Sequence, residues 1–161
     1  MKSVSAETLD PSFRLESHFQ SQLNSNGSMV DRIFASLMLL QYVGCVIAAL
    51  IVTPKTWAGT EYSVHFHVWT AVLFGGLLAI PTAISGLARS GARLNQYAFA
   101  VSQMLFSSLI IHLSGGRLES HFHIFGSIAF LAAYRDPRVI LVATVVTAVD
   151  HFARALIRAR L

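Results

Sequence analysis

Residues 33–52 read IFASLMLLQYVGCVIAALIV, a predominantly apolar run without a charged residue. At 1.5 Å per residue, an α-helix of this length is about 30 Å long, which matches the hydrocarbon core of a bilayer. Asp31 and Arg32 precede the run, and Thr53, Pro54 and Lys55 follow it, so polar residues and a proline mark its ends. The sequence therefore predicts a membrane-spanning helix over about residues 30–53.

Four further apolar stretches follow, separated by short polar breaks. Hydrophobic residues make up 54% of the chain and charged residues only 12%, about half the charged fraction of a typical soluble domain. We therefore expect an all-α fold, a polytopic transmembrane helical bundle of about five spans within residues 29–161. The other spans are predicted over about residues 64–88, 95–114, 118–134 and 138–157. Residues 1–28 are polar and are predicted to form a flexible N-terminal arm.

The distribution of Lys and Arg predicts the orientation of the bundle. A cytoplasmic N-terminus places five arginines inside and only Lys55 and Arg117 in outer loops, as the positive-inside rule requires. Five crossings would leave the arginine-rich tail outside, against the rule, unless the tail lies along the interface, a further helix exists or the number of spans differs by one. Because the basic residues lie mainly at membrane boundaries, the net charge of +4 predicts no nucleic-acid partner. The arginines placed inside are Arg32, Arg89, Arg93, Arg135 and Arg138.

Most of the histidines are expected to share one layer of the membrane. Two pairs begin the second and fourth predicted spans, and two single histidines lie far along the third and fifth, so alternating helix directions bring all of them to the outer third of the bilayer. Three acidic residues reach the same layer, Glu61 and the two named below. These residues are His65, His67, His112, His121, His123 and His151, with Glu119 and Asp150. Ionisable groups at this depth indicate a functional site.

This layer has the composition of a metal site. Imidazole is a common ligand for zinc, copper and iron, and carboxylates often hold its second nitrogen. Residues two apart in a helix point in roughly opposite directions, so a regular helix lets only one of His121 and His123 face the bundle axis. We expect one histidine of each pair to ligate and the other to hydrogen-bond or meet lipid headgroups, although an irregular first turn would let both ligate.

Simpler roles remain open for some of these polar residues. In one alternative, the histidines bind no metal and are amphipathic residues that the membrane interface tolerates. In another, Asp150 and His151 form a structural pair in which Asp150 is either bridged to Arg154 or neutral. Gln41 and Gln103 are expected to make hydrogen bonds between helices.

Several segments resemble the histidine-rich multi-helix membrane region at the N-terminus of bacterial sensor proteins, including histidine kinases, diguanylate cyclases and chemoreceptors. The resemblance covers roughly residues 29–155, and His112–His123 is its most specific part. It implies an input domain in the bacterial inner membrane that signals to a cytoplasmic output module. Family members typically continue to another helix and an output domain, so a chain ending at Leu161 is expected to be a fragment or a stand-alone sensor. The segments are TWAG (56–59), HFHVW (65–69), SQM (102–104), IHLSGGRLESHFHIFG (111–126), AAYRD (132–136) and VDHF (149–152).

The residues and the resemblance together predict a membrane-embedded sensory module without a catalytic domain. A copper, zinc or iron ion, or haem b, is expected at His67, His112, His123 and His151, and its response would shift helix packing. Expected partners are the lipid bilayer and a second copy of the chain or an output module. The alternatives are a haem-b electron-transfer protein and a metal-dependent membrane oxidase or hydroxylase, although the His-x-x-x-His runs typical of such enzymes are absent.

Overall fold

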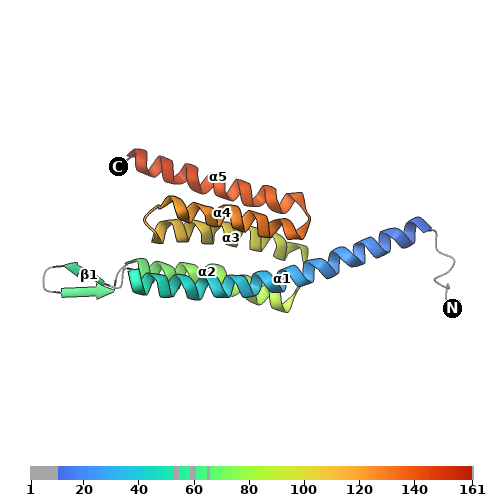
Figure 1. Cartoon of the computed structure of the whole chain (residues 1–161), viewed down its shortest axis with the longest axis horizontal. Helices are drawn as coiled ribbons and strands as arrows, with labels where there is room; N and C mark the ends of the chain where they lie inside the picture. The colour runs from blue at the N-terminus through green and yellow to red at the C-terminus, as the bar shows by residue number, and fades with distance from the viewer. Residues whose placement is uncertain (1–10, 53–54, 59–60, 65, 161) are drawn as a thin grey trace.

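The computed structural model describes residues 11–52, 55–58, 61–64 and 66–160. Within these ranges the chain forms a bundle of five α-helices with one short β-hairpin between the first two (Figure 1). A 3-10 turn, η2, follows the fourth helix. The elements are α1 (Pro11–Val52), β1 (Lys55–Ala58), β2 (Glu61–Val64), α2 (Phe66–Ala88), α3 (Arg93–Leu113), α4 (Leu118–Leu131), η2 (Ala132–Tyr134) and α5 (Pro137–Arg160).

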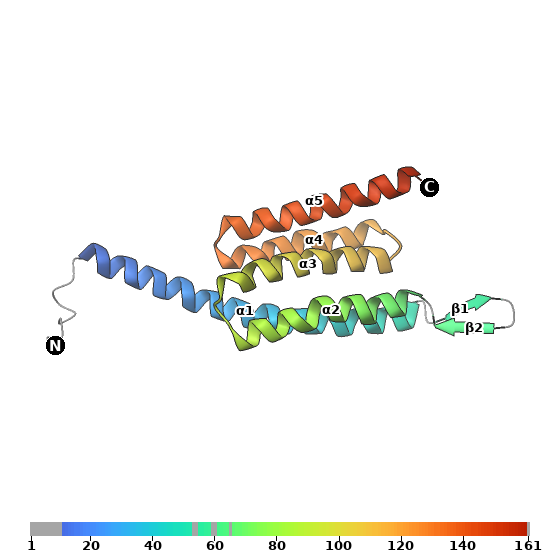
Figure 2. The same ribbon diagram turned by 180° about the vertical axis from the view of Figure 1, so that it is seen from behind.

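Helix α3 is the centre of the bundle. It packs against α1, α2, α4 and α5, and it lies between the α1–α2 pair and α5 in both views (Figures 1 and 2). Its Phe99 and Phe106 are fully buried, as is the polar Gln103. In contrast, large apolar side chains such as Leu77 of α2 and Leu141 of α5 are exposed. An exposed apolar surface around an interior that also holds polar groups suits a helical bundle that is surrounded by lipid.

Four of the predicted spans coincide with helices that are long and apolar enough to cross a membrane. These are the segment Ser25–Ile51 of α1, all of α2, all of α3 and the segment Pro137–Ile157 of α5. The predicted span over 118–134 is instead the 14-residue helix α4 followed by η2. Fourteen residues reach about 21 Å, short of a hydrocarbon core of about 30 Å. The helical bundle is therefore confirmed, whereas a fifth span is not.

The N-terminal part of α1 differs from the flexible arm predicted for residues 1–28. Helix α1 begins at Pro11 and runs without a break through Ser25–Ser28, although residues 1–10 lie outside the described part. Tertiary contacts outweigh the low helix propensity of that polar stretch. Asn26 donates to the carbonyl oxygen of Ala133 at 3.0 Å, and the hydroxyl groups of Ser28 and Ser90 are hydrogen-bonded at 2.8 Å. The first part of α1 projects beyond the bundle, at the end opposite the hairpin (Figure 1).

The connection between α1 and α2, predicted as a loop, contains an antiparallel hairpin. Strand β1 pairs with β2 in a register that places Lys55 opposite Val64 and Trp57 opposite Tyr62. Thr, Trp, Tyr and Val are residues that favour strands, so the local sequence supports the pairing. The hairpin lies at the end of the bundle where α2 begins and α3 ends (Figure 2).

A buried polar cluster joins the helices at the opposite end. The carboxylate of Asp31 is fully buried and accepts three hydrogen bonds. Tyr134 Oη donates at 2.7 Å, the backbone amide of Gly91 at 2.8 Å and Asn95 Nδ2 at 2.9 Å. The cluster connects α1 to α3, to η2 and to the loop between α2 and α3, at the end of the bundle away from the hairpin.

Candidate functional site

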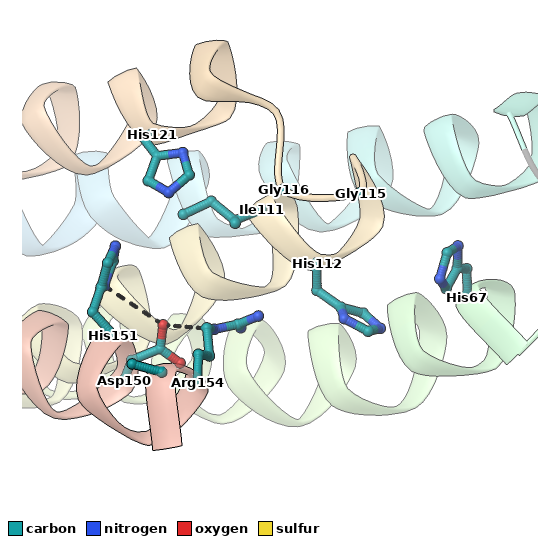
Figure 3. Close-up of a pocket in the computed structure, with 10 residues that line it drawn as sticks. His67, Ile111, His112, Gly115, Gly116, His121, Asp150, His151 and Arg154 are labelled. Carbon is teal, nitrogen blue, oxygen red and sulfur yellow. Dashed lines mark hydrogen bonds and ion pairs between the residues drawn. The ribbon is translucent and has the colours of Figure 1, made fainter. Parts of the chain in front are cut away.

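A cavity of about 470 Å³ lies at the hairpin end of the bundle, among α2, α3, α4 and α5 (Figure 3). Four imidazoles, one carboxylate and one guanidinium line it, together with the glycine turn that connects α3 to α4. We call it the histidine cavity. Its lining residues are His67, Ile111, His112, Gly115, Gly116, His121, Asp150, His151, Arg154 and Ala155.

The first pair of imidazoles joins α2 to α3. His67 lies in the first turn of α2 and His112 in the last turn of α3. Their ring centroids are 5.2 Å apart, with an angle of 73° between the ring planes. Because α2 and α3 run in opposite directions, residues far apart in sequence meet at one end of the bundle. Gly115 and Gly116, which both have positive φ, then turn the chain into α4.

The second pair joins α4 to α5. The ring centroids of His121 and His151 are 5.7 Å apart, with an angle of 66° between the planes. Each Nδ1 lies within hydrogen-bond distance of the carbonyl oxygen one helical turn earlier, Arg117 at 3.1 Å and Thr147 at 3.0 Å. A carbonyl oxygen only accepts, so each Nδ1 carries the proton and the Nε2 of a neutral ring keeps a lone pair. This tautomer suits a histidine that ligates a metal.

Asp150 and Arg154 connect α5 to α3 beside the second pair. Arg154 Nε donates to Asp150 Oδ2 at 2.9 Å, and Ser108 Oγ donates to Asp150 Oδ1 at 2.7 Å. Arg154 also donates to the carbonyl and hydroxyl oxygens of Ser108. The bridge from Asp150 to Arg154, one of the two predictions for this carboxylate, is confirmed. Asp150 Oδ2 is also 3.8 Å from His151 Nδ1, so the carboxylate lies close to the imidazole that it accompanies in sequence.

His123 lies outside the cavity, in a polar cluster between α1, α3 and α4. Its Nε2 is 3.1 Å from Gln41 Nε2, and its Nδ1 is 2.7 Å from Ser107 Oγ. Since Ser107 Oγ donates to the carbonyl oxygen of Gln103 at 3.0 Å, the imidazole is the donor at Nδ1 and accepts from Gln41 at Nε2. Gln103 also donates to Ser127 Oγ at 3.0 Å. The hydrogen bonds between helices predicted for Gln41 and Gln103 are therefore confirmed.

The predicted ligands thus fall into separate groups. His67, His112, His121, His151 and Asp150 line the histidine cavity, whereas His123 has both ring nitrogens in hydrogen bonds of another cluster. Glu119 is exposed in the first turn of α4 and is not among the lining residues, and His65 lies outside the described residues. Among the residues that the structure describes, no three His, Cys, Asp or Glu side chains are grouped closely enough to hold one metal ion.

Sequence reasoning missed the serine partners of this site. Ser107 and Ser108 are adjacent, yet one contacts His123 and the other contacts Asp150 and Arg154. A serine in an apolar helix is usually interpreted as a small residue that allows close packing, so its hydrogen bonds become visible only when the facing helix is known. The signal available in the sequence was their position, about one turn before His112 on the same helix.

No protein-family model matches this chain, and no curated protein or solved structure matches it.

Proposed function

We propose that this chain is a membrane-embedded sensory module that binds a transition-metal ion through the imidazoles of the histidine cavity. The observation that carries the proposal is that four different helices bring two pairs of imidazoles to one cavity. The five arginines predicted to face the cytoplasm lie toward the other end of the bundle, in or beside α1, the loop from α2 to α3, and the turn from η2 to α5. This supports insertion in a bacterial inner membrane with the N-terminus in the cytoplasm and the cavity near the outer face.

The separations within the pairs suit ligation of an ion. When two imidazoles bind one tetrahedral zinc ion through bonds of about 2.0 Å, their ring centroids lie roughly 5–6 Å apart. The observed values of 5.2 and 5.7 Å fall in this range. Zinc, copper and iron all accept imidazole ligands. A bis-histidine haem would instead place one axial imidazole on each face of the porphyrin, whereas each pair here is in direct ring contact, which favours a directly bound ion.

The arrangement of the pairs suggests how the site would signal. Each pair supplies two ligands, whereas a structural zinc site normally has four. Ligation by both pairs would bring α4 and α5 toward α2 and α3, so the ion would have a higher affinity for the closer packing. A ligand with different affinities for two packings shifts the population between them. The continuous helix α1, which contacts α4 through Gln41 and His123, would pass this shift toward an output module or a second copy of the chain.

Removing one imidazole tests the ligand assignment. We expect His121→Ala and His151→Ala each to weaken zinc or copper binding by about 100-fold or more, since loss of an outer partner alone costs 10–100-fold. Elemental analysis and isothermal titration on protein purified in detergent measure the binding of the ion. Hydrogen exchange with and without the ion then measures the proposed shift in helix packing. His18→Ala, in the part of α1 outside the bundle, is the control. Unchanged affinity in both cavity variants would refute the assignment, and a Soret band in the purified protein would favour haem.

A further inference from the structure

A second cavity, of about 450 Å³, lies between α1 and α3 at the same end of the bundle as the histidine cavity. We call it the lateral cavity. Helices α1 and α3 both run toward this end, so the residues later in each helix lie nearer to the end of the bundle. Arg117, which precedes α4, therefore lies farther out than Ile110 and Cys45. The lateral cavity is lined by Cys45, Ala48, Ala49, Ile110, Leu113, Ser114 and Arg117.

The lining explains both the space and its chemistry. Cys45, Ala48 and Ala49 are small residues on one face of α1, and they leave a gap opposite Ile110 and Leu113 of α3. The wall of this gap is predominantly apolar, and its volume is within the range of about 300–1,000 Å³ that is usual for small-molecule sites. The gap is therefore suited to an apolar chain lying between two helices.

Arg117 adds charge at the outer end. The Arg117 side chain is exposed, and no ion pair joins it to any acidic residue whose side chain the structure describes, a set that leaves out Glu61. Lys55, the other basic residue predicted on this face, lies in the hairpin. A guanidinium forms strong, charge-assisted hydrogen bonds with phosphate oxygens, and anionic lipid headgroups attract basic residues at the membrane surface. An apolar gap below a guanidinium has the chemistry of an anionic amphiphile.

We propose that the lateral cavity binds one anionic phospholipid, with an acyl chain between α1 and α3 and the headgroup phosphate on Arg117. The proposal depends on the membrane placement given above and is independent of the metal site. A lipid chain at this position would contact α1 and α3 together, so its occupancy would set how closely these two helices approach.

Native mass spectrometry of the full chain, delipidated in detergent and then supplied with phosphatidylglycerol or phosphatidylcholine, tests the site. We expect one phosphatidylglycerol molecule to be retained in preference to phosphatidylcholine. Arg117→Gln should lower the apparent affinity for phosphatidylglycerol about fivefold, the equivalent of about 1 kcal/mol for one basic residue at the surface. Arg138→Gln, an exposed arginine at the start of α5 and the opposite end of the bundle, should leave it unchanged. Equal retention of the two lipids, or no effect of Arg117→Gln, would overturn the proposal.

The thiol of Cys45 provides a second measurement inside the cavity. In phosphatidylglycerol nanodiscs, the thiol should react with N-ethylmaleimide more slowly in the native chain than in Arg117→Gln. Both chains are measured in the same lipid, so the surface potential of the membrane is equal for the two. Ala48→Leu, which fills the cavity, should lower lipid retention while Arg117 is still present. Reaction rates that are equal in both chains would contradict a bound acyl chain. Failure of the chain to enter nanodiscs at all would contradict the membrane placement itself. Unchanged metal binding in Arg117→Gln would show that the lipid site is independent of the metal site.

Discussion

Replacing Asp31 by alanine is expected to lower the free energy of unfolding by about 3–5 kcal/mol, because its buried carboxylate accepts three hydrogen bonds that would all be lost at once. The hydroxyl group of Tyr134, the side-chain amide of Asn95 and the backbone amide of Gly91 all donate to this carboxylate. The buried hydroxyl group of Tyr134 would lose this acceptor, and an unpaired donor in the interior costs about 1–3 kcal/mol. Asn95 Nδ2 would keep its hydrogen bond to the carbonyl oxygen of Arg89 at 2.8 Å. The measurement is reversible unfolding of the purified protein in mixtures of detergent and SDS, followed by circular dichroism.

Asp136→Ala is the matched control for Asp31→Ala at the same end of the bundle. The Asp136 carboxylate accepts one hydrogen bond from the described residues, from the backbone amide of Arg138 in the first turn of α5, so its loss should cost about 1 kcal/mol. Tyr134→Phe removes a single donor and should fall between neutral and about 1.5 kcal/mol. A loss for Asp31→Ala no larger than that for Asp136→Ala would show that the buried cluster contributes little to stability.

Gly86→Ala is expected to lower the free energy of unfolding by about 2 kcal/mol, the middle of the range for overpacking a close-packed interior. An added Cβ would lie 2.6 Å from Phe99 Cζ, 2.9 Å from Phe99 Cε2 and 3.2 Å from the carbonyl oxygen of Asp31. Phe99 is fully buried and its ring is 5.6 Å from that of Phe34, so it has little room to move. Helix α2 would have to move away from α1 and α3, and the same SDS titration would measure the loss.

The control for Gly86→Ala is the same substitution at Gly126 of α4, where an added Cβ meets nothing within 4 Å. Alanine has the higher helix propensity, so Gly126→Ala should leave stability unchanged or raise it slightly. Equal destabilisation by the two substitutions would mean that close packing at Gly86 does not hold α2 in place.

The choice between neighbouring histidines shows where prediction from sequence stops. The two-residue spacing correctly indicated that His121 and His123 belong to different faces of a helix. The prediction then assigned His123 to the ligand set, whereas in the structure His121 faces His151 across the histidine cavity and His123 contacts Gln41 and Ser107. Spacing gives the angle between two side chains but not the rotation of the helix about its own axis. That rotation is set by the packing of α4 against α1, α3 and α5.

The amino-acid sequence alone determined the apolar helices and the end of the bundle where histidines gather. Both follow from local quantities: the length of an uncharged run, the rise per residue and the alternation of helix direction at each short break. The tertiary structure decided features that the hydropathy of a span does not predict: that α1 continues as helix through Ser25–Ser28, that α4 is short, and that the cavity imidazoles form two pairs. These features depend on contacts between residues far apart in sequence, such as Asn26 with Ala133 and Ser108 with Asp150, whose energies exist only once the helices have packed.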